Sequence, residues 1–411
     1  MIADVPTGAV AARRTHSAER GLDLLNLFVA GVQGGFGPFV AVYLTTQGWT
    51  QTAIGFALSI GTVTAMASQV PAGALVDAVR RKSLVAAFSI LAFSVSALVF
   101  AIHPSPLLIY LVEMLHGISS CTLGPAIVAM SLAVAGRAAL GMRLGRNARY
   151  ASIGNGLGAV LMGACGYYIS SRAVFILAAA LTLPALFALL PLARLDRDPR
   201  MDPEPPPERH AGVLEVLTER RLLIFAASAM LFTLGNAALL PLASTTLTRR
   251  AGDAASLLIA ACIVLPQLIV ALCSPEFGRI VEARGRRGIL LLGFAVLPIR
   301  GALLALVADP TLIVMIQALD GIAAASFGIM VPLITSDLAG RSGHFNLSLG
   351  FVGFAIGLGA TASTTLAGWI ADRLGDPAAF ASLAAIGLAA TILIASAMPE
   401  TGPQSRRGPA L

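Results

Sequence analysis

The sequence is poor in charge, and its few charges are unevenly distributed. Only 12% of its 411 residues are charged and 57% are hydrophobic, whereas a water-soluble protein carries roughly a quarter charged residues. Such a chain cannot cover its own surface with polar groups, so we predict a polytopic membrane protein. The net charge of +7 does not indicate nucleic-acid binding. Nearly all of the basic residues lie in short loops between apolar runs, which is a pattern of membrane topology and not of a binding stripe.

Other patterns are absent as well. The four cysteines lie inside apolar segments without CxxC or Cys/His spacing, so we interpret them as small buried side chains and expect no metal site. Residues 1–20 contain no apolar stretch, which argues against a cleavable signal peptide. The sequence has no nucleotide-binding P-loop, which argues against an ATP-driven pump. No cluster of nucleophiles indicates an enzyme, and we expect no cofactor.

Long apolar runs dominate what is present. Twelve of them are long enough to cross about 30 Å of membrane hydrocarbon, and turn-forming residues such as those at 103–106 and 375–377 separate them. We therefore predict an all-α membrane protein with twelve transmembrane helices. The predicted spans are 22–44, 54–76, 83–102, 107–134, 149–170, 173–192, 222–244, 254–275, 288–308, 311–336, 347–371 and 378–398.

The basic residues orient these spans. With both termini in the cytoplasm, 23 of the 28 lysine and arginine residues fall on the cytoplasmic side and four in the outer loops. The remaining one, Arg300, lies inside an apolar run. This bias follows the positive-inside rule and predicts that the N- and C-termini are both cytoplasmic.

A basic turn occurs twice, at 73–82 and again 205 residues later at 278–287. Its glycine allows two helices to approach closely, its acid can meet a helix N-terminus or an arginine, and its basic cluster holds the loop in the cytoplasm. Gly117 and Gly321 repeat at a similar separation of 204 residues, so the two halves are internal repeats. The residues that define the turns are Gly73, Asp77, Arg81 and Lys82 in the first copy, and Gly278, Glu282, Gly285, Arg286 and Arg287 in the second.

A break in the middle of the chain separates the repeats. Residues 193–221 are rich in proline and charge, a composition that favours an extended linker over a packed core. We predict a cytoplasmic tail at 1–20, a six-helix half at 21–192, a cytoplasmic linker at 193–221, a second six-helix half at 222–398 and a cytoplasmic tail at 399–411.

These features resemble the major facilitator superfamily of transporters, whose loop between helices two and three reads Gly-x-x-x-Asp-Arg-x-Gly-Arg-Arg. The first turn departs from this pattern at Ala78 and Arg80, and the second has Glu282 as its acid. The resemblance implies two six-helix repeats related by an axis along the membrane normal, with the substrate site between them near the midplane. It also implies that Asp77, Glu282 and the nearby basic residues form a cytoplasmic gating latch.

Two spans carry charges near their centres. Arg300 lies near the middle of the ninth run and Asp320 near the middle of the tenth. If these helices form an antiparallel pair joined at Asp309 and Pro310, the two charges lie at similar heights. The sugar/proton symporters of the resembled family also place an arginine on helix nine and a titratable group on helix ten. A proton- or substrate-linked switch and a structural ion pair both remain open.

Glu113 is a second candidate for proton coupling. Many proton-coupled members of the resembled family carry Arg-x-x-x-Gly on helix four. Gly117 matches this glycine, but Glu113 replaces the arginine. A buried carboxyl group here would itself load and release a proton. His116, three residues on, is a candidate partner or cavity residue, or it faces a neighbouring helix.

Polar residues on the first and seventh spans are candidate substrate contacts. These two helices line the cavity in the resembled family, and here they carry Gln33 and Asn236. Hydrogen bonds between helices are the alternative role for both side chains.

The resemblance implies a secondary transporter that works by alternating access in a bacterial inner membrane, and not an enzyme. Proton-coupled efflux of a small amphiphilic compound is favoured by the apolar spans and scarce charge. Proton-coupled uptake of a polar metabolite, such as a sugar or organic anion, is favoured by Arg300 and Asp320. We give efflux the greater weight. The expected partners are a small-molecule substrate, protons and the lipid bilayer, without nucleic acid, and we expect a monomer.

Overall fold

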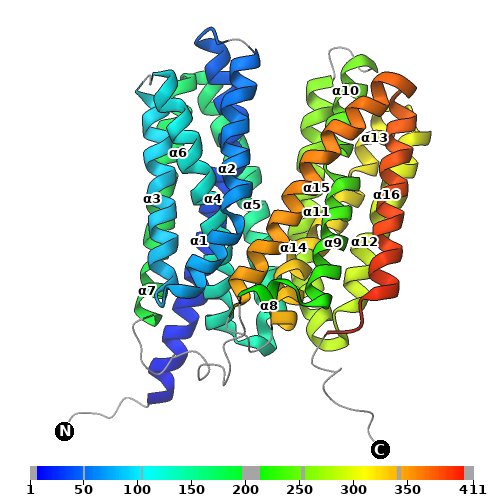
Figure 1. Cartoon of the computed structure of the whole chain (residues 1–411). Helices are drawn as coiled ribbons and strands as arrows, with labels where there is room; N and C mark the ends of the chain where they lie inside the picture. The colour runs from blue at the N-terminus through cyan, green and yellow to red at the C-terminus, as the bar shows by residue number, and fades with distance from the viewer. Residues whose placement is uncertain are drawn as a thin grey trace, which may run out of the picture. The chain divides into compact units, whose positions relative to one another are not determined.

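The structure, a computed structural model, describes residues 7–49, 51–102, 105–196, 213–250, 255–339 and 344–401, and these residues form helices joined by short turns (Figure 1). In chain order the elements are α1 (Thr7–Thr46), α2 (Gln51–Ala78), α3 (Lys82–Ala101), α4 (Pro106–Ala135), the 3-10 helix η1 (Arg137–Ala139), α5 (Leu140–Tyr168), α6 (Ser171–Ala188), α7 (Leu190–Leu195), α8 (Val213–Leu217), α9 (Arg220–Asn236), α10 (Leu239–Arg250), α11 (Ala255–Arg284), α12 (Arg287–Leu306), α13 (Pro310–Ile316), α14 (Ala318–Ala339), α15 (Phe345–Leu374) and α16 (Asp376–Ala397).

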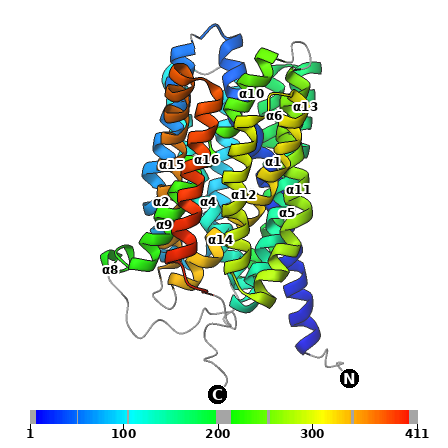
Figure 2. The ribbon, with the colours of Figure 1, turned by 90° about the vertical axis from the view of Figure 1, so that its right-hand side faces the viewer.

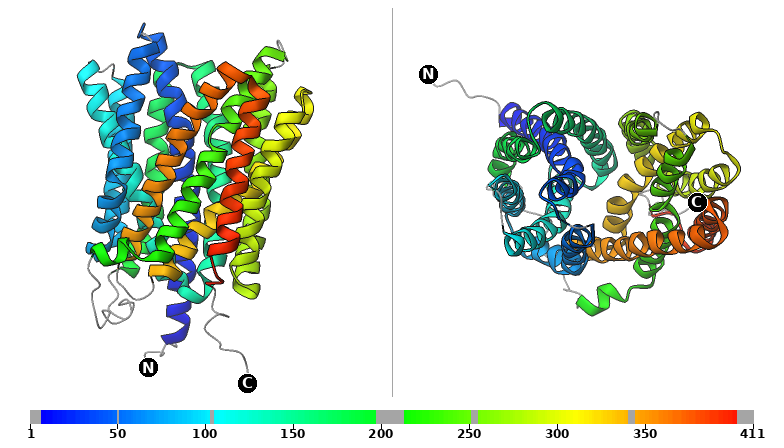
Figure 3. Two further views of the ribbon diagram at one scale, coloured as in Figure 1. Left: turned by 45° about the vertical axis from the view of Figure 1, so that its right-hand side comes forward. Right: turned by 90° about the horizontal axis from the view of Figure 1, so that it is seen from above.

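The helices divide into two compact units. Unit 1 comprises Met1–Leu140 and Tyr150–Pro206, and unit 2 comprises Gly141–Arg149 and Pro207–Leu411. Each unit is a bundle of long helices, seen end-on in the right-hand view of Figure 3. The first turns of α5 therefore belong with unit 2 and its remainder with unit 1. The boundaries of the halves given above stay predictions.

In unit 1, α4 packs against α2 and α3, while α6 packs against α1 and α3. Glycines allow α5 to approach α1 closely: a Cβ atom on Gly158 would lie 2.3 Å from the Gly31 carbonyl oxygen, and one on Gly154 would lie 2.0 Å from that of Leu27. Small residues serve this purpose between membrane helices because lipid gives apolar side chains little reason to associate.

In unit 2, α9 packs against α15 and α16, α12 packs against α14 and α16, and α11 packs against α14. Figure 2 shows α9, α16 and α12 side by side. Phe232 of α9 stacks on Phe327 of α14 with ring centroids 4.4 Å apart, and its ring lies 4.9 Å from that of Phe294 of α12. These rings fill the bundle next to the polar residues described below.

Nine segments of the described chain are long and apolar enough to cross a membrane. They coincide with nine of the predicted spans, and three of them join a pair of consecutive helices (α6 with α7, α9 with α10, α13 with α14). The predicted spans 22–44 and 54–76 fall within α1 and α2, and the span 149–170 overlaps α5 up to its end at Tyr168; these three helices are not among the nine. A multi-pass helical membrane protein is therefore supported, while the number twelve and the cytoplasmic termini stay predictions.

Candidate functional site

Unit 2 holds an arginine that is buried inside the bundle and hydrogen-bonded to three polar side chains. Arg300 of α12 is 1% exposed. Its Nη1 donates to Asn236 Oδ1 at 2.8 Å and to Asp320 Oδ1. Its Nε and Nη2 both donate to Gln317 Oε1, the former at 3.1 Å. The ion pair between Arg300 and Asp320, predicted from their equal depths, is confirmed.

Two of these partners lie where helices are interrupted. Asn236 is the last residue of α9, and α10 begins at Leu239. Gln317 is the single residue between α13 and α14. The interruption after Asn236 is stabilised by Ser363 of α15, whose Oγ accepts from the Ala238 amide at 3.0 Å. Broken helices inside a membrane bundle are tolerated where other groups satisfy the freed backbone, and in transporters they often surround binding sites.

The chemistry of this cluster is that of a nearly neutral, hydrogen-bonded ion pair. Arg300 is enclosed, but the Asp320 side chain is 22% exposed. Gln317 is fully buried, and its Nε2 has no hydrogen-bond partner among the residues that the structure describes. Protonation of Asp320 would remove the charge that balances Arg300, so this pair can couple a proton to a change of partners.

Unit 1 holds a buried carboxyl group in a different setting. Glu113 of α4 is 4% exposed, and its Oε1 has no hydrogen-bond partner in the described part of the chain. Its Oε2 lies against Gly61 of α2, where an added Cβ would be only 2.7 Å away. A charged carboxylate without partners is costly to bury, so this environment favours the neutral acid.

The other two candidates in unit 1 lie near the same helices. His116 is packed edge-on against Phe93 of α3, with ring centroids 4.7 Å apart. Gln33 of α1 is half-buried and, with Phe93 and Thr182, lines a small hollow with room for about one water molecule, whose other walls are aliphatic. Neither observation tests a role in substrate binding, which stays a prediction for both residues.

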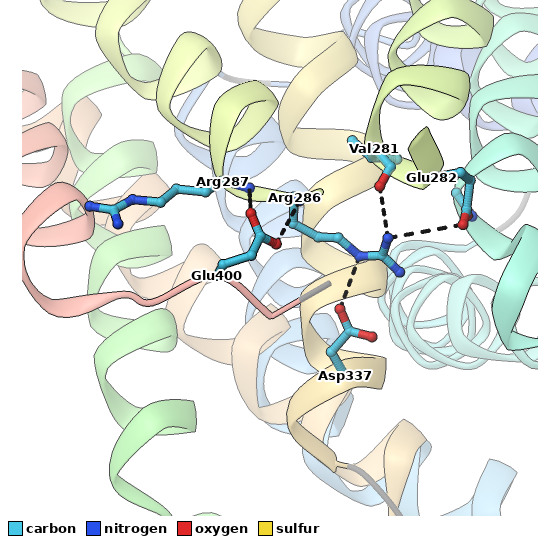
Figure 4. Close-up of polar contacts among 7 residues, drawn as sticks. Val281, Glu282, Arg286, Arg287, Asp337 and Glu400 are labelled. Carbon is cyan, nitrogen blue, oxygen red and sulfur yellow. Dashed lines mark hydrogen bonds and ion pairs between the residues drawn. The ribbon is translucent and has the colours of Figure 1, made fainter. Parts of the chain in front are cut away.

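Three carboxylates, those of Glu282, Asp337 and Glu400, contact the second basic turn (Figure 4). Arg286, 2% exposed, donates from Nε to Asp337 Oδ2 at 3.1 Å and from Nη1 to the Val281 carbonyl at 2.8 Å. Its Nη1 is also 4.0 Å from Glu282 Oε2. On the other side Glu400 accepts from the backbone amides of Arg286 and Arg287 at 2.8 and 3.0 Å. The turn is therefore held by contacts to the Arg286 guanidinium group and by hydrogen bonds to two of its backbone amides.

Two further features complete this turn. Glu282 Oε1 accepts from the Gly141 amide at 2.6 Å, so it caps the first turn of α5, and a Cβ on Gly278 would lie 2.6 Å from the Gly141 carbonyl oxygen. Gly285 has a φ of +94°, which residues with a side chain rarely adopt. It also lies against the Glu400 carboxylate, which the Cβ of any other residue would contact too closely.

The first basic turn is simpler. Lys82 donates from Nζ to the carbonyls of Val76 and Asp77, the second at 3.3 Å. Asp196, directly after α7, accepts from the Ser83 amide at 2.9 Å. Arg81 is exposed, and Gly73 is buried in α2. The predicted gating residues are thus placed in two ordered turns, while their gating role stays a prediction.

Several participants were not predicted from the sequence. Gln317 lies three residues before Asp320, a spacing that puts both on one helix face. Asp196 and Glu400 lie 204 residues apart, the same separation as Gly117 and Gly321. The internal repeat therefore indicates that these two acids occupy equivalent positions. Asp337 and Gly61 had no such signal. Among the described residues, no group of three or more histidine, cysteine, aspartate or glutamate side chains is placed to hold a metal ion.

Comparison with known families gives a match over most of the chain. The family described as Major Facilitator Superfamily matches residues 22–297 and 222–411. Two proteins of Mycobacterium tuberculosis, named as the uncharacterized MFS-type transporters MT2531 (strain CDC 1551 / Oshkosh) and Rv2456c (strain ATCC 25618 / H37Rv), are each 36% identical over 394 residues. Each alignment covers 93% of both chains.

A solved structure has the same fold. The human organic anion transporter MFSD10 (TETRAN) superposes with a TM-score of 0.70, covering 93% of this chain and 99% of that one. The two sequences are 17% identical, so the likeness concerns the fold alone.

Proposed function

The chain belongs to the major facilitator superfamily, and on this premise we propose that it is a proton-coupled secondary transporter that exports a small amphiphilic compound by antiport. The family assignment makes it a multi-pass membrane transporter and not an enzyme. The proposal adds the coupling ion, the direction, the class of substrate and the cell inner membrane as its location.

The observation that carries proton coupling is the setting of Glu113. Its carboxyl group is buried, with one oxygen unpartnered among the described residues. The two helices that pack most extensively on α4 bring no lysine or arginine here, because residues 51–76 of α2 and 83–101 of α3 contain none. Such a group is stable as the neutral acid and must gain water or a partner before it ionises. A carrier that exposes Glu113 to water in one state would release a proton there.

The apolar character of unit 1 supports an amphiphilic substrate. The hollow beside Gln33 is walled mainly by aliphatic and aromatic side chains, among them Val29, Ile90 and Leu123. Binding pockets are mostly apolar, with a few polar groups that fix orientation. The hollow itself is too small for such a compound, so these residues would contact it only in a state of the carrier in which the hollow is wider.

A second function, proton-coupled uptake of a polar metabolite such as a sugar or organic anion, is favoured by the Arg300 cluster. Protonation of Asp320 would break its ion pair with Arg300, and the Arg300 guanidinium could then donate to a substrate carboxylate or hydroxyl. The substrate and the proton would then travel in the same direction. The gating role proposed for residues 73–82 and 278–287 is common to both functions, and it is supported by the cap that Glu282 places on α5.

Everted membrane vesicles test the proposal. Respiration acidifies their lumen, a pH-sensitive dye reports the gradient, and lipophilic dyes, sugars or organic acids are added outside, which is the cytoplasmic face. We expect an amphiphilic compound to discharge the gradient in wild-type vesicles and not in Glu113→Gln vesicles. Glu276→Gln is the matched control, because Glu276 is an exposed residue paired with exposed Arg279.

Two outcomes would contradict the proposal. Discharge that is unchanged in Glu113→Gln vesicles would remove Glu113 from coupling. If no added compound discharges the gradient, but vesicles preloaded with a sugar or organic acid lose that compound and protons together, transport is symport and the direction proposed here is wrong.

A further inference from the structure

The contact between α2 and α4 places a glycine directly against the Glu113 carboxyl group. A Cβ on Gly61 would lie 2.7 Å from Glu113 Oε2 and 3.4 Å from the Glu113 carbonyl oxygen. The first distance is shorter than real Cβ contacts. One turn along α4, a Cβ on Gly117 would lie 2.5 Å from the Gly61 carbonyl oxygen. The two helices therefore meet backbone to backbone, and the carboxyl group occupies the space that a side chain at position 61 would take.

The equivalent contact in unit 2 keeps the close approach of the two backbones but has neither the glycine nor the carboxyl group. A Cβ on Gly321 would lie 2.7 Å from the Pro266 carbonyl oxygen, so Pro266 of α11 stands where Gly61 stands in unit 1. Gln317 stands where Glu113 stands, and its oxygen accepts from Arg300. The unit that carries the carboxyl group has the glycine, and the unit that carries the amide has a larger residue.

Few titratable groups face this contact. His116 is on the same helix and packs on Phe93, and the Cys121 thiol donates to the Ala65 carbonyl at 2.8 Å. Residues 51–76 of α2 and 83–101 of α3 contribute no charged side chain. The location of the carboxyl group is therefore set by shape, because Glu113 forms no ion pair with any residue that the structure describes.

We propose that Gly61 is a positioning residue for proton coupling: its missing side chain lets the Glu113 carboxyl group rest between α2 and α4 as a neutral acid. This inference rests on the proposed role of Glu113. The Cβ of an alanine at position 61 would clash with Glu113 Oε2 and displace the carboxyl group from the contact between α2 and α4. An aspartate at position 113 is one methylene shorter, so its carboxyl group would withdraw from position 61 and tolerate the alanine.

Labelling with dicyclohexylcarbodiimide tests the inference without a known substrate, because this reagent modifies protonated carboxyl groups in apolar surroundings. The purified full-length protein is labelled in liposomes at pH 6, and mass spectrometry follows the peptide that contains residue 113. We expect Gly61→Ala to slow labelling about tenfold, because the displaced carboxyl group loses the apolar contact that keeps it neutral.

A comparison of four proteins separates positioning from general disturbance. We expect Gly61→Ala to change labelling less than about twofold when position 113 is aspartate, since the steric conflict is then gone. Gly124→Ala is the matched control, because Gly124 is on α4 and its added Cβ would meet nothing within 4 Å. An unchanged rate in Gly61→Ala, or an equal loss in the glutamate and aspartate backgrounds, would overturn the inference.

The proposed function fails separately. If wild-type Glu113 is labelled and responds to Gly61→Ala, but Glu113→Gln vesicles still exchange protons, then Gly61 positions an acid that does not couple transport. Absence of labelling at wild-type Glu113 would overturn the positioning role, because no neutral acid would then rest in the contact.

Discussion

The third and fourth helices of the two repeats share one pattern of burial but carry different polar residues within it. Eight buried positions of α3 recur in α12 at a separation of 204 residues, from Val85 and Ile289 to Phe100 and Leu304. Thirteen of the fourteen buried positions of α4 recur as buried positions of α13, Gln317 and α14 at the same separation. The pattern of buried positions is therefore repeated almost residue for residue.

The polar positions in that shared frame are not repeated. Arg300 corresponds to Ser96, Gln317 to Glu113 and Asp320 to His116. In unit 2 the long guanidinium reaches three partners. In unit 1 the Ser96 hydroxyl is fully buried and has no hydrogen-bond partner among the described residues. The acid of the fourth helix is thus held in an ion pair with Arg300 in unit 2, whereas in unit 1 one oxygen of Glu113 has no hydrogen-bond partner among the described residues.

Replacing the fourth-helix carboxyl group of each unit by an amide should separate the two cases most strongly. Asp320→Asn leaves Arg300 buried without its carboxylate, so we expect it to lower the free energy of unfolding by about 3–5 kcal/mol. Glu113→Gln replaces a neutral acid by an amide of similar shape, so we expect a loss of about 1 kcal/mol. Unfolding in mixed micelles, followed by circular dichroism, measures both. Equal losses would mean that Glu113 is charged and paired, and the contrast between the units would be lost.

Changes at the corresponding third-helix positions should have smaller effects. Arg300→Lys keeps the charge but cannot contact Gln317 and Asp320 with the same planar fork, so we expect a loss of about 2 kcal/mol. Ser96→Ala removes a hydroxyl without a partner among the described residues and should change stability by less than about 0.5 kcal/mol. The same micelle titration is suitable. A larger loss for Ser96→Ala would show that its hydroxyl has a partner in solution.

The sequence predicts the elements of this comparison better than their contacts. The turn at Asp309 and Pro310 fixes the relative depth of the ninth and tenth helices, so the pairing of Arg300 with Asp320 follows from counting residues. The partnership with Asn236 does not follow, because it depends on where α9 is interrupted. Pro241 lacks the N–H that would bond to the Ala237 carbonyl, so the sequence does favour an interruption near here, but its exact place also depends on Ser363, far along the chain, which helps to stabilise it.

Close packing is the other feature that sequence alone does not predict. A glycine at position 61 is one of 41 in the chain, and only the distance from its missing Cβ to Glu113 distinguishes it. Likewise, Glu400 lies 114 residues after the Arg286 amide that it accepts from. The internal repeat relates Glu400 to Asp196, but it does not indicate which backbone amides either acid contacts.

The carboxylates that follow the last helix of each unit should give the smallest difference. Glu400 accepts from two amides at the start of α12, whereas Asp196 accepts from one at the start of α3. A carboxylate at a helix N-terminus typically contributes about 0.5–2 kcal/mol, so we expect Glu400→Ala to cost about 1.5 kcal/mol and Asp196→Ala about half as much. Hydrogen exchange should accelerate at residues 286 and 287 in the first variant and at residue 83 in the second. Glu276→Ala, at an exposed pair, should leave these amides unchanged, and unchanged exchange in Glu400→Ala would show that this cap is not maintained in solution.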